Sequence, residues 1–333
     1  MSTLTVRLIE PHEFDTWDEF VASSPHGTLF HTSVWKRVID SAFAPARLVL
    51  MGCFDGFMLV GGCVALDRER YGQRTAVTPL VTPYAGFILE SPLGEKLSDQ
   101  TSRQSEVLTA LTQWMQKEYA YQNLINPPHL EDMRPLIQAG YRLTPRFTYL
   151  INLKLPAEEI WQRFDGSVRR QIKKAEREGF DLSDEMEPAE GYALLEATFA
   201  RRGEECPVSR EMFDAVAGAE PLRDYRQVMA AHHGGRLASY IVTLKFQRTL
   251  YYELAATHPD YLSTGVSSLL IWEIVKAHAC EAWNTFDFVG ANIPSIARFK
   301  EGFNPRLQMH FQAEYLGAPL IRLGKTMLDL LKR

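Results

Sequence analysis

The sequence predicts a mixed α/β protein with two similar domains, each a mostly antiparallel central sheet flanked by helices. Two hairpins carry this prediction: residues 47–66, with an Asp-Gly turn, and residues 226–246, with a Gly-Gly turn. They have matching strand lengths and lie about 180 residues apart, which is too long for a solenoid repeat. We therefore infer duplication of one α/β domain, with domains at 1–153 and 154–316 and a terminal helix at 317–333.

Composition limits the classes of function. The chain of 333 residues has room for two domains of ordinary size. Its hydrophobic content of 46% and charged content of 23% are those of a soluble globular protein. The net charge of −5 argues against a general binder of DNA or other polyanions, although a local basic stripe remains open.

The cysteines and the apolar runs also exclude some classes. Cys53, Cys63, Cys206 and Cys280 form no Cys-x-x-Cys pair and have no zinc-ligand spacing, so we expect no metal site. Cys53 and Cys63 flank the first hairpin, where two buried thiols are a better account than a disulfide. The first residues lack the apolar segment of a signal peptide, and no run approaches about 18 apolar residues. We expect a cytoplasmic protein with at most peripheral membrane contact.

The remaining elements follow from periodicity and from cap and turn residues. In the first domain we expect strands at 3–10, 47–54, 58–66, 75–80, 85–89, 124–126 and 147–153, and helices at 11–23, 33–43, 104–121 and 131–139. Residues 91–100 are expected to form a polar loop.

The second domain repeats the plan. We expect helices at 161–164, 167–179, 189–202, 210–218, 265–280 and 294–302, and strands at 180–184, 226–233, 237–246, 249–256, 285–289 and 307–315. The terminal helix has one apolar side, which predicts docking on the core, with membrane-surface binding as the alternative.

Residues 284–304 are the first candidate for a functional site. They read as a buried strand, a Gly-Ala-Asn turn and a short helix opened by Pro294, and such joints place chemistry in α/β folds. Asp287 lies among apolar residues, where a carboxylate is costly unless it is paired. Free N–H groups at the helix start can receive an anion. Lys300 lies beside Phe299 on the helix. The alternative is an ordinary joint with a surface lysine.

Several short motifs occur together in an order typical of one family. They are Phe-His-Thr-Ser-x-Trp at 30–35, Ser-Val-Arg-Arg-Gln-Ile-Lys-Lys-Ala at 167–175, Phe-Asp-Phe-Val-Gly at 286–290, Ile-Pro at 293–294 and Phe-Lys-x-x-Phe at 299–303. Over most of residues 10–315 this pattern resembles the FemAB-like branch of the GNAT acyltransferase superfamily. Asn304 stands where the family has Gly, and both residues tolerate positive φ.

The resemblance implies two GNAT-like domains side by side, which agrees with the duplicated hairpins. It also implies transfer of an acyl or aminoacyl group from an activated donor to an amine, such as that of a cell-wall or surface-polysaccharide precursor. It places acceptor contacts near His31, Trp35 and Lys36, although a capping or surface histidine is the alternative for His31. Further expected substrate contacts are Tyr251, Tyr252, Asn292 and Phe299.

One helix carries the strongest electrostatic signal. Its cations Arg169, Arg170, Lys173, Lys174 and Arg177 fall within an arc of about 140°. An anionic partner would relieve their repulsion, and a solvated basic face is the alternative. We expect Arg169, Arg170 and Lys173 to contact the donor. Family members that use aminoacyl-tRNA have a long coiled-coil arm here, whereas residues 156–178 have room only for a short helix pair; related members lack the arm, so tRNA stays open.

The turn before residue 265 is a second candidate for donor binding. In GNAT enzymes a glycine-rich version of this turn presents N–H groups to a pyrophosphate. Here only Gly265 remains, with Ser263 and Thr264 beside it. A plain capped helix is an equally good account.

Transfer to an amine requires a base and stabilisation of the developing oxyanion. Glu253, Asp287 or His258 could take the proton, and Lys300 could stabilise the oxyanion or the leaving group. The sequence has no Gly-x-Ser-x-Gly, no catalytic Cys–His signature and no zinc motif, so direct attack by the acceptor is favoured over a covalent intermediate.

Three functions therefore remain open. The first is a FemAB-like N-acyltransferase that uses acyl-CoA or aminoacyl-tRNA as co-substrate, binds no permanent cofactor and acts on a small or lipid-linked acceptor. The second is an acyl-CoA-dependent N-acetyltransferase acting on an amino sugar. The third is a non-catalytic module that binds a nucleotide or a lipid-linked sugar, which the reduced glycine turn favours.

Overall fold

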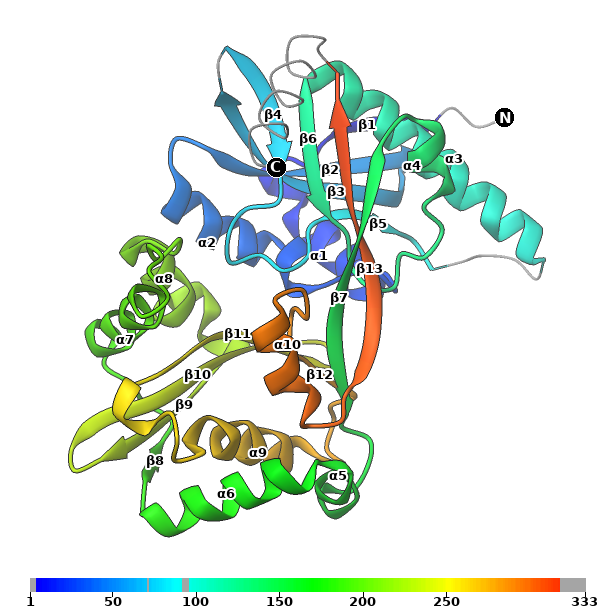
Figure 1. The fold of residues 1–333 in the computed structure, drawn as a ribbon. Coiled ribbons are helices and arrows are strands. Elements are labelled where there is room, and N and C mark those ends of the chain that lie inside the picture. Colours follow the sequence, from blue (N-terminus) through cyan, green and yellow to red (C-terminus); the bar gives the residue numbers. More distant parts are fainter. Residues whose placement is uncertain (1–3, 71, 92–95, 318–333) are drawn as a thin grey trace. The chain divides into compact units, whose positions relative to one another are not determined.

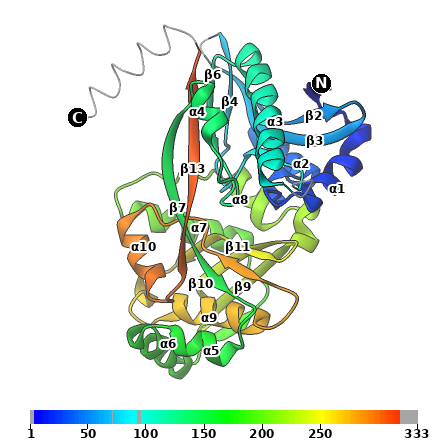
Figure 2. The same cartoon turned by 90° about the vertical axis from the view of Figure 1, so that its right-hand side faces the viewer.

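The computed structural model describes residues 4–70, 72–91 and 96–317. The chain divides into two compact units: unit 1 comprises residues 1–146 and the chain from 309 onward, and unit 2 comprises 147–308. Each unit has a sheet with helices packed on it (Figures 1 and 2). The predicted mixed α/β class with mostly antiparallel sheets is confirmed.

Unit 1 is a sheet in the order β1-β2-β3-β4-β6-β13, with β5 paired to β3. The pairs are antiparallel except for β4 and β6, which run parallel. The strands are β1 (Leu4–Leu8), β2 (Arg47–Asp55), β3 (Met58–Arg70), β4 (Gln73–Val77), β5 (Gly86–Leu89), β6 (Tyr121–Ile125) and β13 (Arg306–Leu316). The helices are α1 (Phe14–Ser23), α2 (Ser33–Phe43), α3 (Leu97–Glu118) and α4 (Arg134–Gln138), with 3₁₀ turns at Pro11–Glu13 and Leu29–His31.

Unit 2 repeats this order as β8-β9-β10-β11-β12-β7, with β11 and β12 as its parallel pair. The strands are β7 (Arg142–Asn152), β8 (Asp181–Ser183), β9 (Arg226–His233), β10 (Arg236–Phe246), β11 (Thr249–Thr257) and β12 (Thr285–Asp287). The helices are α5 (Ala157–Arg163), α6 (Gly166–Glu178), α7 (Pro188–Ala200), α8 (Arg210–Ala217), α9 (Val266–His278) and α10 (Pro294–Glu301), with 3₁₀ turns at Glu220–Tyr225 and Pro259–Tyr261.

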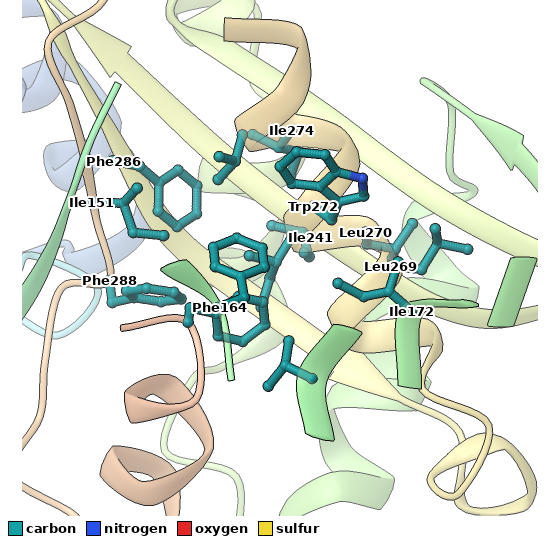
Figure 3. Packing of buried hydrophobic residues seen from close by; sticks show 14 of the residues in the cluster. Ile151, Phe164, Ile172, Ile241, Leu269, Leu270, Trp272, Ile274, Phe286 and Phe288 are labelled. Carbon is teal, nitrogen blue, oxygen red and sulfur yellow. The ribbon is translucent and has the colours of Figure 1, made fainter. Parts of the chain in front are cut away.

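In unit 2 the helices cover both faces of the sheet. Helices α7 and α8 lie on one face, and α9, backed by α6, lies on the other (Figure 1). The predicted apolar side of α6, formed by Val168, Ile172 and Ala175, is buried as expected. It joins a core with Phe286 and Phe288 of the strand that leads to α10 (Figure 3).

The last strand of each unit's sheet comes from the part of the chain that follows the other unit's helices. Strand β7 follows α4 of unit 1 but pairs with β12 of unit 2, through Leu150, Ile151 and Asn152. Strand β13 follows α10 of unit 2 but pairs with β6 of unit 1, through Gln312–Leu316. Each sheet is therefore completed by a strand that is distant in sequence.

Some predicted bounds differ from the structure. Helix α3 begins at Leu97, so the prediction of a loop over 91–100 is wrong for its last residues. The reason is that the first turns of α3 are polar, and its buried stripe begins only at Val107. Strand β7 begins at Arg142, earlier than predicted, because its first residues are polar and solvated. Most other bounds agree within a few residues.

The domain limits at 153 and 316 stay a prediction, and the compact units have different limits because of the exchanged strands. The predicted terminal helix lies outside the described residues from 318 on. Cys53 and Cys63 are buried free thiols, as expected. Within the described part of the chain, no helix has the length and apolarity needed to cross a membrane.

Candidate active site

Lys300 lies on the inner side of α10 and is only 7% exposed. Its ammonium donates hydrogen bonds to the carbonyl oxygens of Phe288, at 2.8 Å, and Gly290, at 2.7 Å. It also lies 5.7 Å from the ring centroid of Tyr252, within cation–π range. Burial lowers the pKa of Lys300 to about 8, and the charge of Asp287 opposes this shift. Lys300 is thus a buried cation at the end of β12 rather than a surface lysine.

Asp287, the last residue of β12, is buried and held by hydrogen bonds. Its Oδ1 accepts from the Thr148 hydroxyl at 2.5 Å and from the Val289 backbone N–H at 2.7 Å. The Val289 bond closes a tight turn in which Val289 adopts φ 49°. The costly carboxylate noted in the sequence is therefore fixed by hydrogen bonds to β7 and to its own turn.

Glu253 lies at a β-bulge of β11. Val242 and Thr243 of β10 pair with Leu254 and Tyr252, so Glu253 between them has no partner in the ladder. Bulges often reorient a side chain beside an active site. Burial, and to a smaller extent the charge of Asp287, raise the pKa of Glu253 to about 8. Its Oε2 is buried without a hydrogen-bond partner among the described residues.

The parallel strands β11 and β12 are paired only up to Tyr251 and Asp287. Their register runs from Thr249 with Thr285 to Tyr251 with Asp287, whereas β11 continues to Thr257. Beyond Tyr251 the backbone of β11 therefore has no described partner on the β12 side. From the divergence and the bulge we expect backbone N–H groups near Glu253 to be available to a ligand, an arrangement suited to a developing oxyanion.

The structure brings together the three residues predicted to be catalytic. Asp287 influences the pKa of both Glu253 and Lys300, so the three groups lie within electrostatic reach. Buried titratable groups with perturbed pKa values and opposite charge are typical of catalytic sites. The arrangement supplies a carboxylate that can accept a proton near neutral pH and a cation that can stabilise negative charge. Their catalytic roles remain a prediction.

The other predicted residues of this region lie around the three groups. Tyr251 is buried on the same row of the sheet as Asp287, and Tyr252 packs against Phe288. The side-chain amide of Asn292 accepts from the Phe147 N–H at 3.0 Å and donates to the Phe147 carbonyl at 3.1 Å. These two bonds anchor the turn to β7. Phe299 is partly exposed on α10. Substrate contact by these residues stays a prediction.

The third candidate base, His258, lies at the surface end of β11. It precedes the 3₁₀ turn Pro259–Tyr261, where its Nδ1 accepts from the Asp260 N–H at 3.2 Å. Its Nε2 lies 2.5 Å from an Arg236 guanidinium nitrogen. These contacts favour a turn-fixing role over that of a base.

The predicted acceptor residues of unit 1 are tied into its core. His31 and Trp35 are fully buried, and Trp35 Nε1 donates to Thr82. Burial lowers the pKa of His31 to about 3, so the ring is neutral. Lys36 pairs with Asp40 at 2.7 Å and donates to a backbone carbonyl at 2.7 Å. These positions favour structural roles, and acceptor contact by them is a prediction that the geometry does not support.

The predicted donor residues lie at two adjoining places. Helix α6 directs Arg170, Lys173 and Arg177 to solvent, with Arg169 half-buried. Lys174 donates to the carbonyl of Ser263 at 2.9 Å, which ties α6 to the turn before α9.

The turn itself has a glycine-dependent geometry. Gly265 adopts φ 89°, and a Cβ there would lie 2.4 Å from the Gln171 carbonyl of α6. Only glycine allows this approach. The Thr264 hydroxyl, one residue before the N-cap Gly265, accepts from the Val266 N–H at 3.3 Å. The cationic face of α6 beside the α9 N-terminus stays the predicted contact for a donor.

Sequence reasoning missed two neighbours of the site. Thr148 is fully buried on β7 and bonds Asp287. Tyr149 beside it donates to Glu301 at 2.7 Å, next to Lys300 on α10. Both lie far from α10 in sequence, and alternation within β7 was the only available signal. Among the described residues no cluster of His, Cys, Asp or Glu could hold a metal ion.

Comparison with known proteins agrees with this geometry. Residues 162–301 match the family described as acetyltransferase (GNAT) domain. The fold is similar to that of FemX, with a TM-score of 0.70 and 13% identity over 96% of this chain and 99% of that one. No curated protein sequence matches the chain significantly.

Two further solved structures share the fold. One is L-PGS from Bacillus licheniformis, with a TM-score of 0.55 and 12% identity over 97% of this chain and 98% of that one. The other is a tandem GNAT protein from the clavulanic acid biosynthesis pathway, with a TM-score of 0.53 and 14% identity over 95% and 99%. The domain match and the fold together indicate an acyltransferase: residues 162–301 match a GNAT acetyltransferase domain, and the fold of the chain is similar to that of FemX.

Proposed function

We propose that this protein transfers an acyl or aminoacyl group from a phosphate-bearing donor to an amine, with the reaction centre in unit 2. One observation carries the proposal: Glu253, Asp287 and Lys300 are grouped where β11 and β12 stop pairing. The GNAT domain match covers all three residues. The acceptor class that fits the family is an amine of a cell-wall or surface-polysaccharide precursor, made in the cytoplasm.

The proposed reaction is a direct attack. The acceptor ammonium first gives a proton to Glu253, and the free amine then attacks the acyl carbon of the donor. Backbone N–H groups at the bulge and the Lys300 ammonium stabilise the oxyanion of the tetrahedral intermediate. The bond to the leaving sulfur or oxygen breaks as the amide forms, and the leaving group takes up the proton that the attacking nitrogen loses. Asp287 positions the turn that presents the carbonyl groups to Lys300.

The donor phosphates would bind where α6 adjoins the N-terminus of α9. The exposed cations Arg170, Lys173 and Arg177 supply positive charge, and the helix N-terminus supplies N–H groups. Acyl-CoA and aminoacyl-tRNA both carry such phosphates. The GNAT acetyltransferase match favours acyl-CoA, whereas the long basic face of α6 would suit the acceptor end of a tRNA.

The test first identifies the donor that binds and then measures transfer to an amine. Thermal shift with acetyl-CoA, longer acyl-CoAs and charged tRNA identifies the donor, because a ligand stabilises the state that binds it. Transfer to glucosamine or to an amine-bearing peptide precursor is then followed by product mass. The wild type is compared with Glu253→Gln and with Lys276→Met, an exposed lysine on α9 that serves as the control.

The outcomes decide the class of protein. Product from the wild type and the control, but much less from Glu253→Gln, supports the transferase. Tight donor binding with no turnover on any amine would instead indicate the non-catalytic binding module. No binding of any donor would contradict the proposal.

A further inference from the structure

A pocket lies at the β8–β9 edge of unit 2. It has a volume of about 870 Å³, and Arg226 and Val228 of β9 are among its lining residues. Arg226, Leu244, Tyr251 and Asp287 pair in one row across the sheet, so they project from the same face. That row spans three strand spacings, or about 14 Å. Helix α7 packs on β10 and β11 between them, so the pocket is separate from the reaction centre.

The sheet edge at this pocket is incomplete. Strand β8 pairs with β9 only from Ala230 to His232, and its chain turns away after Ser183. The half of β9 from Arg226 to Met229 therefore has no described strand beside it on that side. Such an edge presents backbone groups to which an extended peptide can add as a further strand.

Arg226 brings a positive charge to the pocket. It is half-buried, and its Nη1 donates to the Ala219 carbonyl at 3.0 Å. It forms no ion pair with any residue that the structure describes. Burial lowers its pKa, and the charge of Glu220 only partly opposes this shift. A guanidinium has five N–H donors, so most of them are available to a ligand carboxylate.

The acidic wall of the pocket consists of Asp184, Glu185, Glu187 and Glu190, and all four are exposed without an ion pair in the described chain. Arg223 also lines the pocket, but it is paired with Glu220 at 3.3 Å. Like charges so close together repel, and a cationic ligand group would relieve this cost. The loop that carries them is fixed, because the Glu185 N–H donates to the Ser183 hydroxyl at 3.0 Å. One pocket thus holds opposite charges that are not joined to each other.

We infer that this pocket binds a short extended peptide with a free C-terminal carboxylate and a cationic side chain. The carboxylate would pair with Arg226, the cationic side chain would face the acidic wall, and the peptide backbone would add to the open edge of β9. A single anion would leave the acidic wall unpaired, and a single cation would leave Arg226 unpaired. Only a ligand with both charges satisfies both walls.

Isothermal titration with three probes tests this inference. The probes are Ala-Lys-Ala with a free carboxylate, the same peptide as its C-terminal amide, and inorganic phosphate. We expect the free acid to bind at least about tenfold more tightly than the amide, since one charge-assisted pair is lost. Arg226→Gln should abolish this difference. The double variant Glu185→Gln with Glu187→Gln should weaken both peptides and keep their ratio.

The controls separate this site from the reaction centre. Arg202→Gln, beyond the other end of α7, should bind as the wild type does. Lys300→Met should also bind the peptide normally, whatever it does to transfer. Equal binding of acid and amide, absence of peptide binding at millimolar concentration, or phosphate binding as tightly as the peptide would each overturn the inference.

Discussion

The hydroxyl of Thr148 donates a hydrogen bond of 2.5 Å to Oδ1 of Asp287, and both side chains are buried. This bond links β7 to the end of β12. Replacing Thr148 by Val should lower the free energy of unfolding by about 1–3 kcal/mol, because a buried carboxylate loses a donor. Urea unfolding measures this loss. Thr148→Ser keeps the hydroxyl and should retain most of the stability; equal loss in both variants would contradict the role of the bond.

The rate of transfer should depend on pH in a bell shape centred near pH 8. The pKa of Glu253 is raised to about 8, so its basic form is populated only as pH rises. The pKa of Lys300 is lowered to about 8, so its charge is lost as pH rises further. The pH profile of kcat/KM reports both limbs as properties of the coupled group. Glu253→Gln should remove the acid limb, and a flat wild-type profile would contradict the assignment.

Lys300→Met should reduce transfer by about 10²–10³-fold, the usual effect of removing one donor to an oxyanion. Because Lys300 also bonds the carbonyls of Phe288 and Gly290, the variant should lose about 1–3 kcal/mol of stability as well. Product formation and thermal unfolding measure the two effects. Loss of stability with unchanged turnover would show that the lysine is only structural.

Gly265→Ala should destabilise the start of α9. Its φ of 89° and the 2.4 Å approach of a new Cβ to the Gln171 carbonyl both oppose a side chain. We expect a loss of about 1–3 kcal/mol and weaker donor binding. Gly179→Ala is the matched control, because Gly179 has φ 72° but nothing within 4 Å of the added atom. Equal losses in the two variants would mean that the contact with α6 is unimportant.

Unit 1 should lose stability in mild acid. Burial lowers the pKa of His26 to about 4, of His31 to about 3 and of His310 to about 4, from an ordinary value of 6.5. The unfolded chain therefore binds protons below pH 6.5 that the folded chain does not. Each histidine should cost about 2 kcal/mol between pH 7.5 and pH 5, most of it below pH 6.5. Urea unfolding at pH 7.5 and pH 5 measures the loss, and equal stability at both would contradict it.

Much of the fold could be predicted from local sequence patterns. The Asp55-Gly56 and Gly234-Gly235 turns fixed both hairpins, and the stripe of Val168, Ile172 and Ala175 fixed the buried side of α6. The grouping of Glu253 with Asp287 could not be predicted in the same way. It depends on a bulge and on the parallel pairing of two strands that an entire helix separates in sequence.

The burial of His31 could not be predicted from local patterns. His31 directly precedes Thr32, the cap of α2, and such a position fits a surface residue as well as a buried one. Its ring bonds Thr28, and the neighbouring Phe30 packs against Tyr84 from a distant segment. Likewise, the polar first turns of α3 gave no apolar stripe by which the helix start could be recognised.

The exchange of β7 and β13 limits how the gene can be divided. A fragment that stops at residue 153 would lack β13, so the edge of β6 would be uncovered. A fragment that begins at residue 154 would lack β7, so β12 would be uncovered in turn. Uncovered strand edges promote aggregation. Either half expressed alone should therefore be insoluble, whereas the two halves produced together should rescue each other.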